Sequence, residues 1–305
     1  MGNFFQIHLC AIIFSITVKR IRFWRGSQQG VTLRPRLRRQ IIVNDSSIRL
    51  DGQKVLITGV SRPLGIGATL AKRFAEAGAT VAIHGFSEYD MALGHQSAMD
   101  NATEILSEEL KSQGLEVTAL LSSDLEKSGA AEAVVEEAVA KLGSLDGMIL
   151  NHAYSTYGEI DQWTDGHIDS HLLVNVRASM MMIQSFVNQA NTKKDRAITL
   201  FTSGQYLGPM VNEIAYCVSK EAIICLCRQT ARLLGDKNIR VNCINPGPND
   251  TGYSFGKEHE KIAEMFPSGR WGTPNDTADL ALFIHSSYGR WITGQLIASD
   301  GGFGQ

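Results

Sequence analysis

The 305-residue sequence predicts a doubly wound α/β fold, in which helices cover both faces of a parallel seven-stranded sheet. Seven short apolar or β-branched runs recur after residue 50. Most of these runs are continuous rather than alternating, as is typical of parallel strands that are buried on both faces. Amphipathic stretches separate the runs, and a glycine-rich turn follows the first of them. Together these features indicate repeated strand–helix units.

The predicted elements follow one another along the chain without an internal repeat. Strands are expected at Lys54–Gly59, Thr80–His84, Glu116–Leu121, Leu145–Asn151, Ala197–Ser203, Ile239–Asn245 and Gln295–Ser299. Helices are expected at Ala68–Ala77, Ala102–Gln113, Ala130–Leu142, Gly166–Ala190 and Ala215–Leu234. Because such sheets bind ligands at the carboxyl ends of their strands, the residues after each strand are the first candidates for a site.

The composition excludes several classes of protein. With 29 Lys+Arg, 31 Asp+Glu and a net charge of -2, the chain lacks the basic character that nucleic-acid binding needs, and no nucleic-acid partner is expected. A hydrophobic content of 44% is enough for a large core and argues against disorder. Five cysteines indicate no disulfide framework, and the spacing of Cys225 and Cys227 suits no zinc motif, so we predict no metal site.

Residues 1–45 differ from the domain expected over residues 50–305. Residues 4–18 are mostly apolar, and the Arg-rich stretch after them contains no acid until Asp45. The apolar run is shorter than the roughly 20 residues of a spanning helix, although tilt or bilayer thinning could let it cross. Its basic flank would then keep the domain on the cytoplasmic side. Three interpretations stay open: membrane association of a cytoplasmic protein, an organelle import peptide, and a disordered or wrongly assigned start.

The first candidate site is the stretch Thr-Gly-Val-Ser-Arg-Pro-Leu-Gly-Ile-Gly at residues 58–67. It follows a predicted strand and opens a predicted helix, which is the context that a dinucleotide-binding turn requires. Gly59, Gly65 and Gly67 would let the backbone approach a pyrophosphate, and the helix would present unpaired N–H groups to it.

The second candidate site is the pair Tyr216 and Lys220, which share one face of a predicted helix. A nearby ammonium favours phenolate, so we expect Lys220 to lower the pKa of Tyr216 from about 10 and make it a general acid or base. Ser203 ends a predicted strand thirteen residues before Tyr216, where its hydroxyl could bind a carbonyl oxygen of the substrate. The three residues together are far more specific than the Tyr–Lys spacing alone.

With these motifs the sequence resembles the classical short-chain dehydrogenase/reductase family over residues 50–305. The turn corresponds to the family's Thr-Gly-x-x-x-Gly-x-Gly, residues 151–154 stand where it has Asn-Asn-Ala-Gly, and residues 300–302 match its C-terminal Asp-Gly-Gly. The resemblance implies a single Rossmann-fold domain with an N-terminal extension, and a homodimer or homotetramer. It implies the catalytic residues Asn175, Ser203, Tyr216 and Lys220. The cofactor-binding residues that it implies are Gly59, Arg62, Gly65, Ile66, Gly67, Asp124, Leu125, Asn151, Tyr216, Lys220, Pro246, Gly247 and Thr251.

The resemblance also implies roles for the four catalytic residues. Ser203 would fix the carbonyl oxygen, and Tyr216 would protonate it during reduction or deprotonate the alcohol in the reverse direction. Lys220 would bind the nicotinamide ribose. Asn175 would hold a water that links Lys220 to solvent, or would serve only as the residue at a helix kink. A mobile lid is implied over Asn249–Ser268.

Two departures from the family pattern bear on function. Five residues separate Gly59 and Gly65 instead of three, as in the divergent enoyl-reductase branch, whereas the Tyr–Lys spacing is classical. His152 and Tyr154 replace the family's usual Asn and Gly. The motifs Thr202–Gln205, Pro246–Gly252 and Trp291–Gln295 are similar to a bacterial subgroup labelled 3-oxoacyl-carrier-protein reductase-like. We therefore expect a reductase of 3-oxoacyl thioesters or related ketones. The alternatives are a catalytically silent NADP-sensing protein and a membrane-attached reductase of lipid carbonyls.

The choice of cofactor is predicted from the end of the second strand, where NAD enzymes carry an acid. That position corresponds to Gly85, so no carboxylate there repels a 2′-phosphate. Arg62 could pair with the phosphate in bidentate fashion. His84 could assist, or could only pack at the strand end. These observations favour NADP(H) over NAD(H).

Overall fold

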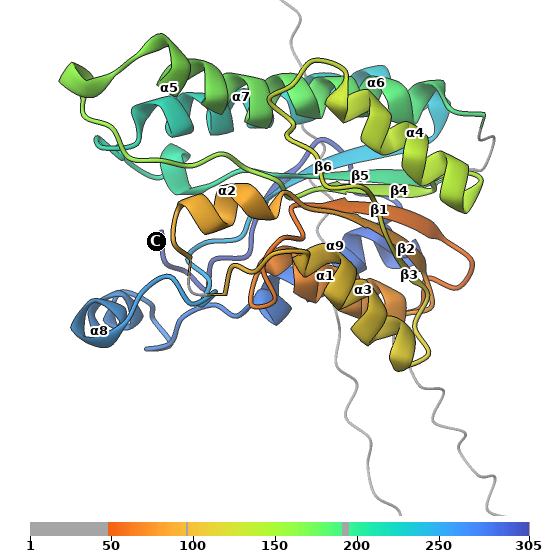
Figure 1. Ribbon diagram of the computed structural model, residues 1–305, viewed down its shortest axis with the longest axis horizontal. Helices are drawn as coiled ribbons and strands as arrows, with labels where there is room; N and C mark the ends of the chain where they lie inside the picture. The colour runs from red at the N-terminus through yellow and green to blue at the C-terminus, as the bar shows by residue number, and fades with distance from the viewer. Residues whose placement is uncertain (1–47, 96, 191–194, 305) are drawn as a thin grey trace, which may run out of the picture. The chain divides into compact units, whose positions relative to one another are not determined.

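The computed structural model describes residues 48–95, 97–190 and 195–304. Its seven parallel strands form one sheet in the order β3-β2-β1-β4-β5-β6-β7 (Figure 1). The strands are β1 (Lys54–Thr58), β2 (Thr80–His84), β3 (Val117–Ala119), β4 (Gly147–Leu150), β5 (Arg196–Phe201), β6 (Ile239–Asn245) and β7 (Leu296–Ala298). The predicted fold class is confirmed. Residues 1–45 lie outside the described residues, so the three interpretations of this segment stay predictions.

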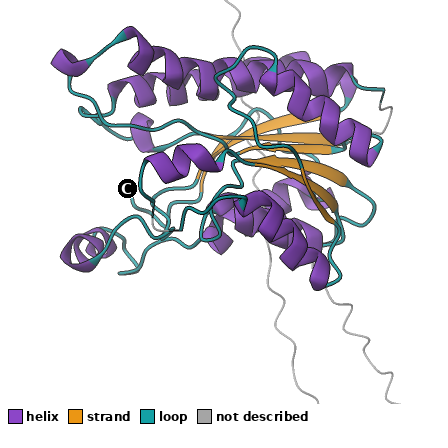
Figure 2. Ribbon diagram, in the orientation of Figure 1, coloured by secondary structure: helices purple, strands orange, loops and turns teal. Residues whose placement is uncertain are grey.

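Helices cover both faces of the sheet (Figure 2). One face carries α1 (Ile66–Glu76), α3 (Ala102–Ser112) and α9 (Pro274–His285), and the other carries α4 (Ala130–Leu142), α6 (Ala178–Asn188) and α7 (Ile214–Leu233). Shorter helices are α2 (Ser87–Ala92), α5 (Asp165–Ser170) and α8 (Gly256–Glu264), with 3₁₀ turns at Ile160–Gln162, Gly204–Tyr206, Gly235–Lys237 and Ser287–Gly289. Within the described ranges, no helix is long and apolar enough to cross a bilayer.

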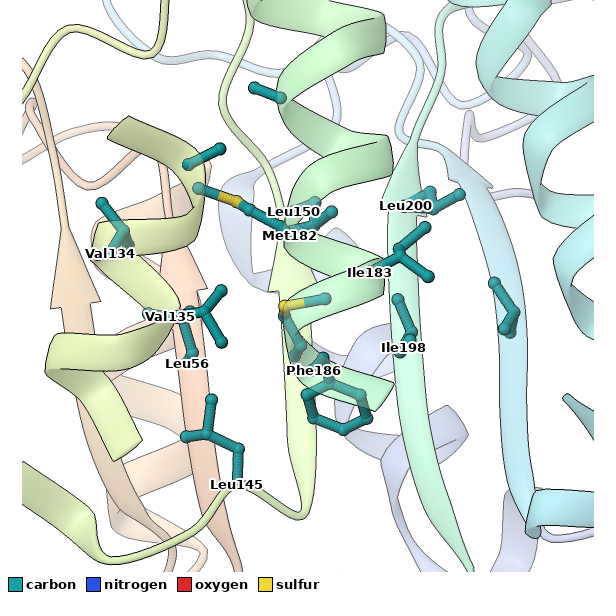
Figure 3. Close-up of a cluster of buried hydrophobic side chains, with 14 of the residues drawn as sticks. Leu56, Val134, Val135, Leu145, Leu150, Met182, Ile183, Phe186, Ile198 and Leu200 are labelled. Carbon is teal, nitrogen blue, oxygen red and sulfur yellow. The ribbon is translucent and has the colours of Figure 1, made fainter. Parts of the chain in front are cut away.

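The core lies on both sides of the sheet because the strands are apolar on both faces. Under α4, α6 and α7 the core includes Leu145, Met182 and Phe186 (Figure 3). Met181 packs against this cluster, whereas Met180 is half exposed. Two of the three consecutive methionines therefore fill the core.

The structure differs from the sequence prediction between residues 166 and 190. One continuous helix was expected there, but α5 and α6 are separated by a π-helical turn at His171–Arg177. The wider turn contains Asn175, whose side chain binds the backbone of Tyr154 in the loop after β4. π-Helical turns of this kind are frequent at functional sites.

Candidate active site

A cleft of about 370 Å³ opens at the carboxyl edge of the sheet, near the ends of β1 and β4 where the strand order reverses. Most of the residues predicted from the sequence line it: Gly59, Arg62, Gly65, Ile66, Asp124, Leu125, Asn151, Tyr216, Lys220, Pro246, Gly247 and Thr251. Gly67, Asn175 and Ser203 are absent from this lining, and each of them contacts a residue that belongs to it.

The glycine-rich turn lines the cleft with backbone atoms that no side chain covers. Gly59 has a φ of 72°, in the left-handed region that favours glycine, and a Cβ at Gly67 would overlap the carbonyl oxygen of Gly59. Helix α1 begins after Gly65 with no side-chain cap and no acid in its first turn. Its unpaired N–H groups and positive dipole end therefore fit a diphosphate.

We predict that Gly67→Ala destabilises the fold through this overlap, because neither backbone segment can move without disturbing β1 or α1. The expected loss is about 1–3 kcal/mol in the free energy of unfolding, as for other overpacked positions. Urea unfolding of the nucleotide-free protein measures it. Gly166→Ala is the matched control, since a Cβ there meets nothing within 4 Å. Equal stability of the two variants would contradict the proposed close packing.

The loop after β4 is tied to the turn after β1. Asn151 donates from Nδ2 to the carbonyl oxygen of Gly59 at 3.1 Å. His152, which replaces the usual asparagine of the family, shares a 2.7 Å hydrogen bond between Nδ1 and Oγ1 of Thr58. Burial, and to a lesser degree the charge of Lys220, lowers the pKa of His152 to about 3. His152 is therefore a neutral packing residue at physiological pH.

Tyr216 and Lys220 meet in the cleft on successive turns of α7, and Ser203 reaches them from the loop after β5. Burial raises the pKa of Tyr216 to about 12, and a hydrogen bond with Ser203 opposes this rise. Burial also lowers the pKa of Lys220 to about 8. The Nζ atom of Lys220 donates to the carbonyl oxygen of Phe201 at 3.0 Å and lies 5.6 Å from the centroid of the Tyr216 ring.

The expectation that Lys220 lowers the pKa of Tyr216 is wrong, because burial raises this pKa to about 12. The ammonium is directed to a backbone carbonyl, and removal of the phenol from water dominates its titration. Tyr216 is therefore a neutral phenol at pH 7 and can donate a proton.

Asn175 is held by three short side-chain hydrogen bonds. Its Oδ1 accepts the N–H of Tyr154 at 2.7 Å, and its Nδ2 donates to the carbonyl oxygen of Tyr154 at 2.9 Å and to Oγ of Ser219 at 2.8 Å. Ser219 in turn donates to the carbonyl oxygen of Tyr216 at 2.7 Å. These contacts join the π-helical turn to the β4 loop and to α7. The water-holding role of Asn175 stays a prediction.

The loop after β6 is organised by two asparagines. Oδ1 of Asn245 accepts the N–H of Gly247 at 3.1 Å, and Asn249 donates from Nδ2 to the carbonyl oxygen of Pro246 at 2.7 Å. Gly247 has a φ of 61°, and a Cβ on it would lie 2.6 Å from Cα of Asp300. Asn249 lines the cleft but was not among the predicted site residues. Its position in the Pro-Gly-Pro-Asn sequence, which is typical of a turn, could have indicated that Asn249 belongs to the site.

His84, which ends β2, and Asp124, which follows β3, also line the cleft. Burial lowers the pKa of His84 to about 4, and its Nε2 shares a 3.0 Å hydrogen bond with Oγ of Ser123. His84 therefore carries no positive charge at neutral pH, which favours the packing role over assistance to a phosphate. Asp124 accepts the N–H of Glu126 at 2.8 Å.

Helix α2, which Figure 1 shows beside the carboxyl end of the sheet, was not predicted from the sequence. Its Tyr89 and Asp90 line the cleft. Nε of Arg62 lies 3.2 Å from Oδ1 of Asp90, so the predicted phosphate ligand already has an acidic partner. The sequence could have indicated this contribution of α2 only through its position, because α2 directly follows the carboxyl end of β2. In the part of the chain that the structure describes, no three His, Cys, Asp or Glu residues are grouped to hold a metal ion.

Comparison with known proteins agrees with this geometry. A family model described as enoyl-(acyl carrier protein) reductase matches residues 59–304. An uncharacterized oxidoreductase, YjdA of Bacillus subtilis (strain 168), is 33% identical over 81% of this chain and 95% of its own length. A 3-oxoacyl-[acyl-carrier-protein] reductase of Chlamydia muridarum is 29% identical over 83% of this chain and 98% of its length. A short-chain dehydrogenase from Burkholderia cenocepacia, solved with NADP, is 28% identical with a TM-score of 0.74, over 84% of this chain and all of the other.

The sheet, the bare glycine turn and the Ser–Tyr–Lys cluster define an NAD(P)-dependent oxidoreductase. The chain belongs to the short-chain dehydrogenase/reductase family, and its distant relatives include 3-oxoacyl-[acyl-carrier-protein] reductases.

Proposed function

We propose that the protein is an NADPH-preferring reductase of a 3-oxoacyl thioester or a related ketone. The observation that carries this proposal is the neutral, hydrogen-bonded phenol of Tyr216 beside Ser203 and Lys220 in a nucleotide-sized cleft. The residues present fit a nicotinamide dinucleotide, since α1 offers an uncapped N-terminus and the walls offer Asp124, Asn151 and Thr251. When bound, the dihydronicotinamide supplies the hydride.

The chain's own residues would handle the carbonyl oxygen. Ser203 would donate a hydrogen bond to it, which stabilises the negative charge that develops during reduction. Tyr216 would transfer its proton to the same oxygen. A pKa of about 12 keeps this proton in place at pH 7 until charge builds up on the substrate. Lys220, with a pKa of about 8, is mostly protonated at pH 7 and would stabilise the phenolate that remains.

Preference for the 2′-phosphate follows from the packing around Gly85. A Cβ at this position would lie 2.5 Å from the carbonyl oxygen of Val60 and 2.6 Å from Oγ1 of Thr103. Thr103 is fixed there because its hydroxyl donates to Val60 at 2.8 Å. An acid that selects NAD therefore has no room in this chain, while Arg62 lies in the cleft. The NADP complex of the Burkholderia cenocepacia relative agrees with this preference.

We predict that NADPH binds about tenfold or more tightly than NADH, as expected for a charge-assisted contact to the phosphate. Titration of the full chain with each nucleotide, followed by the change in nicotinamide fluorescence, gives both dissociation constants. Repeating the titrations at higher salt is expected to weaken NADPH more than NADH, because the extra phosphate contact is electrostatic. Equal affinities, or tighter binding of NADH, would overturn the cofactor assignment.

The substrate class is tested by initial rates of NADPH oxidation with a carbonyl panel. The panel contains a 3-oxoacyl thioester, its unesterified 3-oxo acid, simple ketones, quinones and sugars. The proposal predicts the highest kcat/KM for the thioester or for an uncharged ketone of similar length. A clear preference for sugars or quinones would keep the reaction type and replace the substrate.

A further inference from the structure

The cation in the glycine-rich turn is paired with a carboxylate from a different element. Nε of Arg62 lies 3.2 Å from Oδ1 of Asp90 on α2, and the hydroxyl of Ser61 donates to Oδ2 of the same carboxylate. Asp90 is only 7% exposed, although both of its partners line the cleft. A buried carboxylate fixed by a hydrogen bond from Ser61 constrains the charged side chain that pairs with it.

Helix α2 is also anchored on the other side of the cleft. The hydroxyl of Tyr89 accepts the N–H of Ser155 at 2.8 Å and donates to the carbonyl oxygen of Ser155 at 3.0 Å. The ring of Tyr89 packs on that of Tyr154, with centroids 5.1 Å apart. The β1 loop and the β4 loop therefore both determine where Asp90 lies. Asp90 is held in place from two directions and does not depend on Arg62 for its position.

The contact uses the inner nitrogen of the guanidinium. Arginine has five N–H donors in a rigid fork, and an ion pair made through Nε leaves the Nη1 and Nη2 donors for a second anion. Across the described ranges, neither Nη atom of Arg62 has a hydrogen-bond partner, and the side chain is 23% exposed at the cleft. An arginine held in this way is oriented in advance for bidentate contact with a phosphate.

We propose that Asp90 is a positioning residue that sets selectivity for the 2′-phosphate of the cofactor by holding Arg62 through Nε. This inference rests on the proposed NADPH preference. Asp90 also lines the cleft, and the positive charge of Arg62 beside it would offset the repulsion between this carboxylate and a bound phosphate. A freely rotating arginine would lose side-chain entropy on binding the phosphate, and the contact with Asp90 reduces this cost.

The test measures binding of 2′,5′-ADP and of ADP to the full chain by calorimetry, which needs no turnover. In the wild type, 2′,5′-ADP is expected to bind more tightly than ADP. Asp90→Ala is expected to weaken 2′,5′-ADP about tenfold, as for one charge-assisted contact, and to leave ADP within about twofold. Asp90→Asn keeps a polar oxygen beside Nε of Arg62 and is expected to restore most of the preference. Glu88→Gln is the matched control, because Glu88 is an exposed acid on the same helix.

Each other outcome has one meaning. Tighter binding of 2′,5′-ADP to Asp90→Ala would show that the carboxylate repels the phosphate, and equal losses for both nucleotides would show a structural role alone; either result overturns the inference. In an Arg62→Ala background, Asp90→Ala is expected to have no further effect on 2′,5′-ADP. If Asp90→Ala does not fold, Asp90→Asn is measured alone. A folded Asp90→Asn variant that lacks the preference for 2′,5′-ADP over ADP would overturn the inference. If the wild type binds 2′,5′-ADP no more tightly than ADP, the proposed preference for NADPH is wrong, and this inference is wrong with it.

Discussion

Replacement of Tyr216 by Phe is expected to lower kcat for carbonyl reduction by about 10³-fold, within the range for loss of a general acid. The variant keeps the ring that packs in the cleft and loses only the hydroxyl that bonds to Ser203. The affinity for NADPH is expected to stay within about twofold of the wild type, since the proposal assigns nucleotide binding mainly to the glycine turn and the loop after β6. Initial rates and nucleotide titration measure the two quantities.

Tyr288→Phe is the matched control for this substitution, because Tyr288 is 63% exposed and lies outside the cleft lining. It is expected to retain wild-type kcat. If Tyr216→Phe retains more than about a tenth of the wild-type kcat, another group protonates the substrate. A loss of less than about tenfold is smaller than the contribution that general acid catalysis makes to kcat.

Acidification is expected to unfold the protein steeply below about pH 6, because three buried histidines cannot take up protons in the folded state. Burial lowers the pKa of His84 to about 4 and the pKa values of His152 and His285 to about 3. Between these values and the ordinary pKa of about 6.5, the unfolded chain binds protons that the folded chain does not. Stability therefore falls as pH falls, by up to about 4 kcal/mol per pH unit for three protons near pH 5.

Urea unfolding midpoints at pH 7, 6 and 5 measure this loss. His152→Asn places the family's own residue at that position and is expected to reduce the pH dependence by about one proton, or about 1.4 kcal/mol per pH unit. A stability that is flat between pH 7 and 5 would contradict the buried neutral state of these rings.

The sequence predicted all seven strands, and most of the site residues predicted from it line the cleft, because strand burial and the glycine turn depend on local patterns. Three features were not predictable in this way. The pKa of Tyr216 is set by burial among distant segments, and the π-helical turn forms where Asn175 meets the β4 loop. The pairing of Arg62 with Asp90 joins two loops whose contact arises only from the tertiary fold.

Transfer of label from NADPH to product tests the central claim most directly. The full chain is incubated with NADPH carrying deuterium at one or the other face of C4 and with a 3-oxoacyl thioester or ketone, and the alcohol is analysed by mass spectrometry. The account predicts deuterium on the carbinol carbon from one of the two labelled forms, and no labelled alcohol with Tyr216→Phe over the same time. Tight binding of NADPH without labelled alcohol from any carbonyl in the panel would contradict a reductase and favour a protein that only binds the nucleotide.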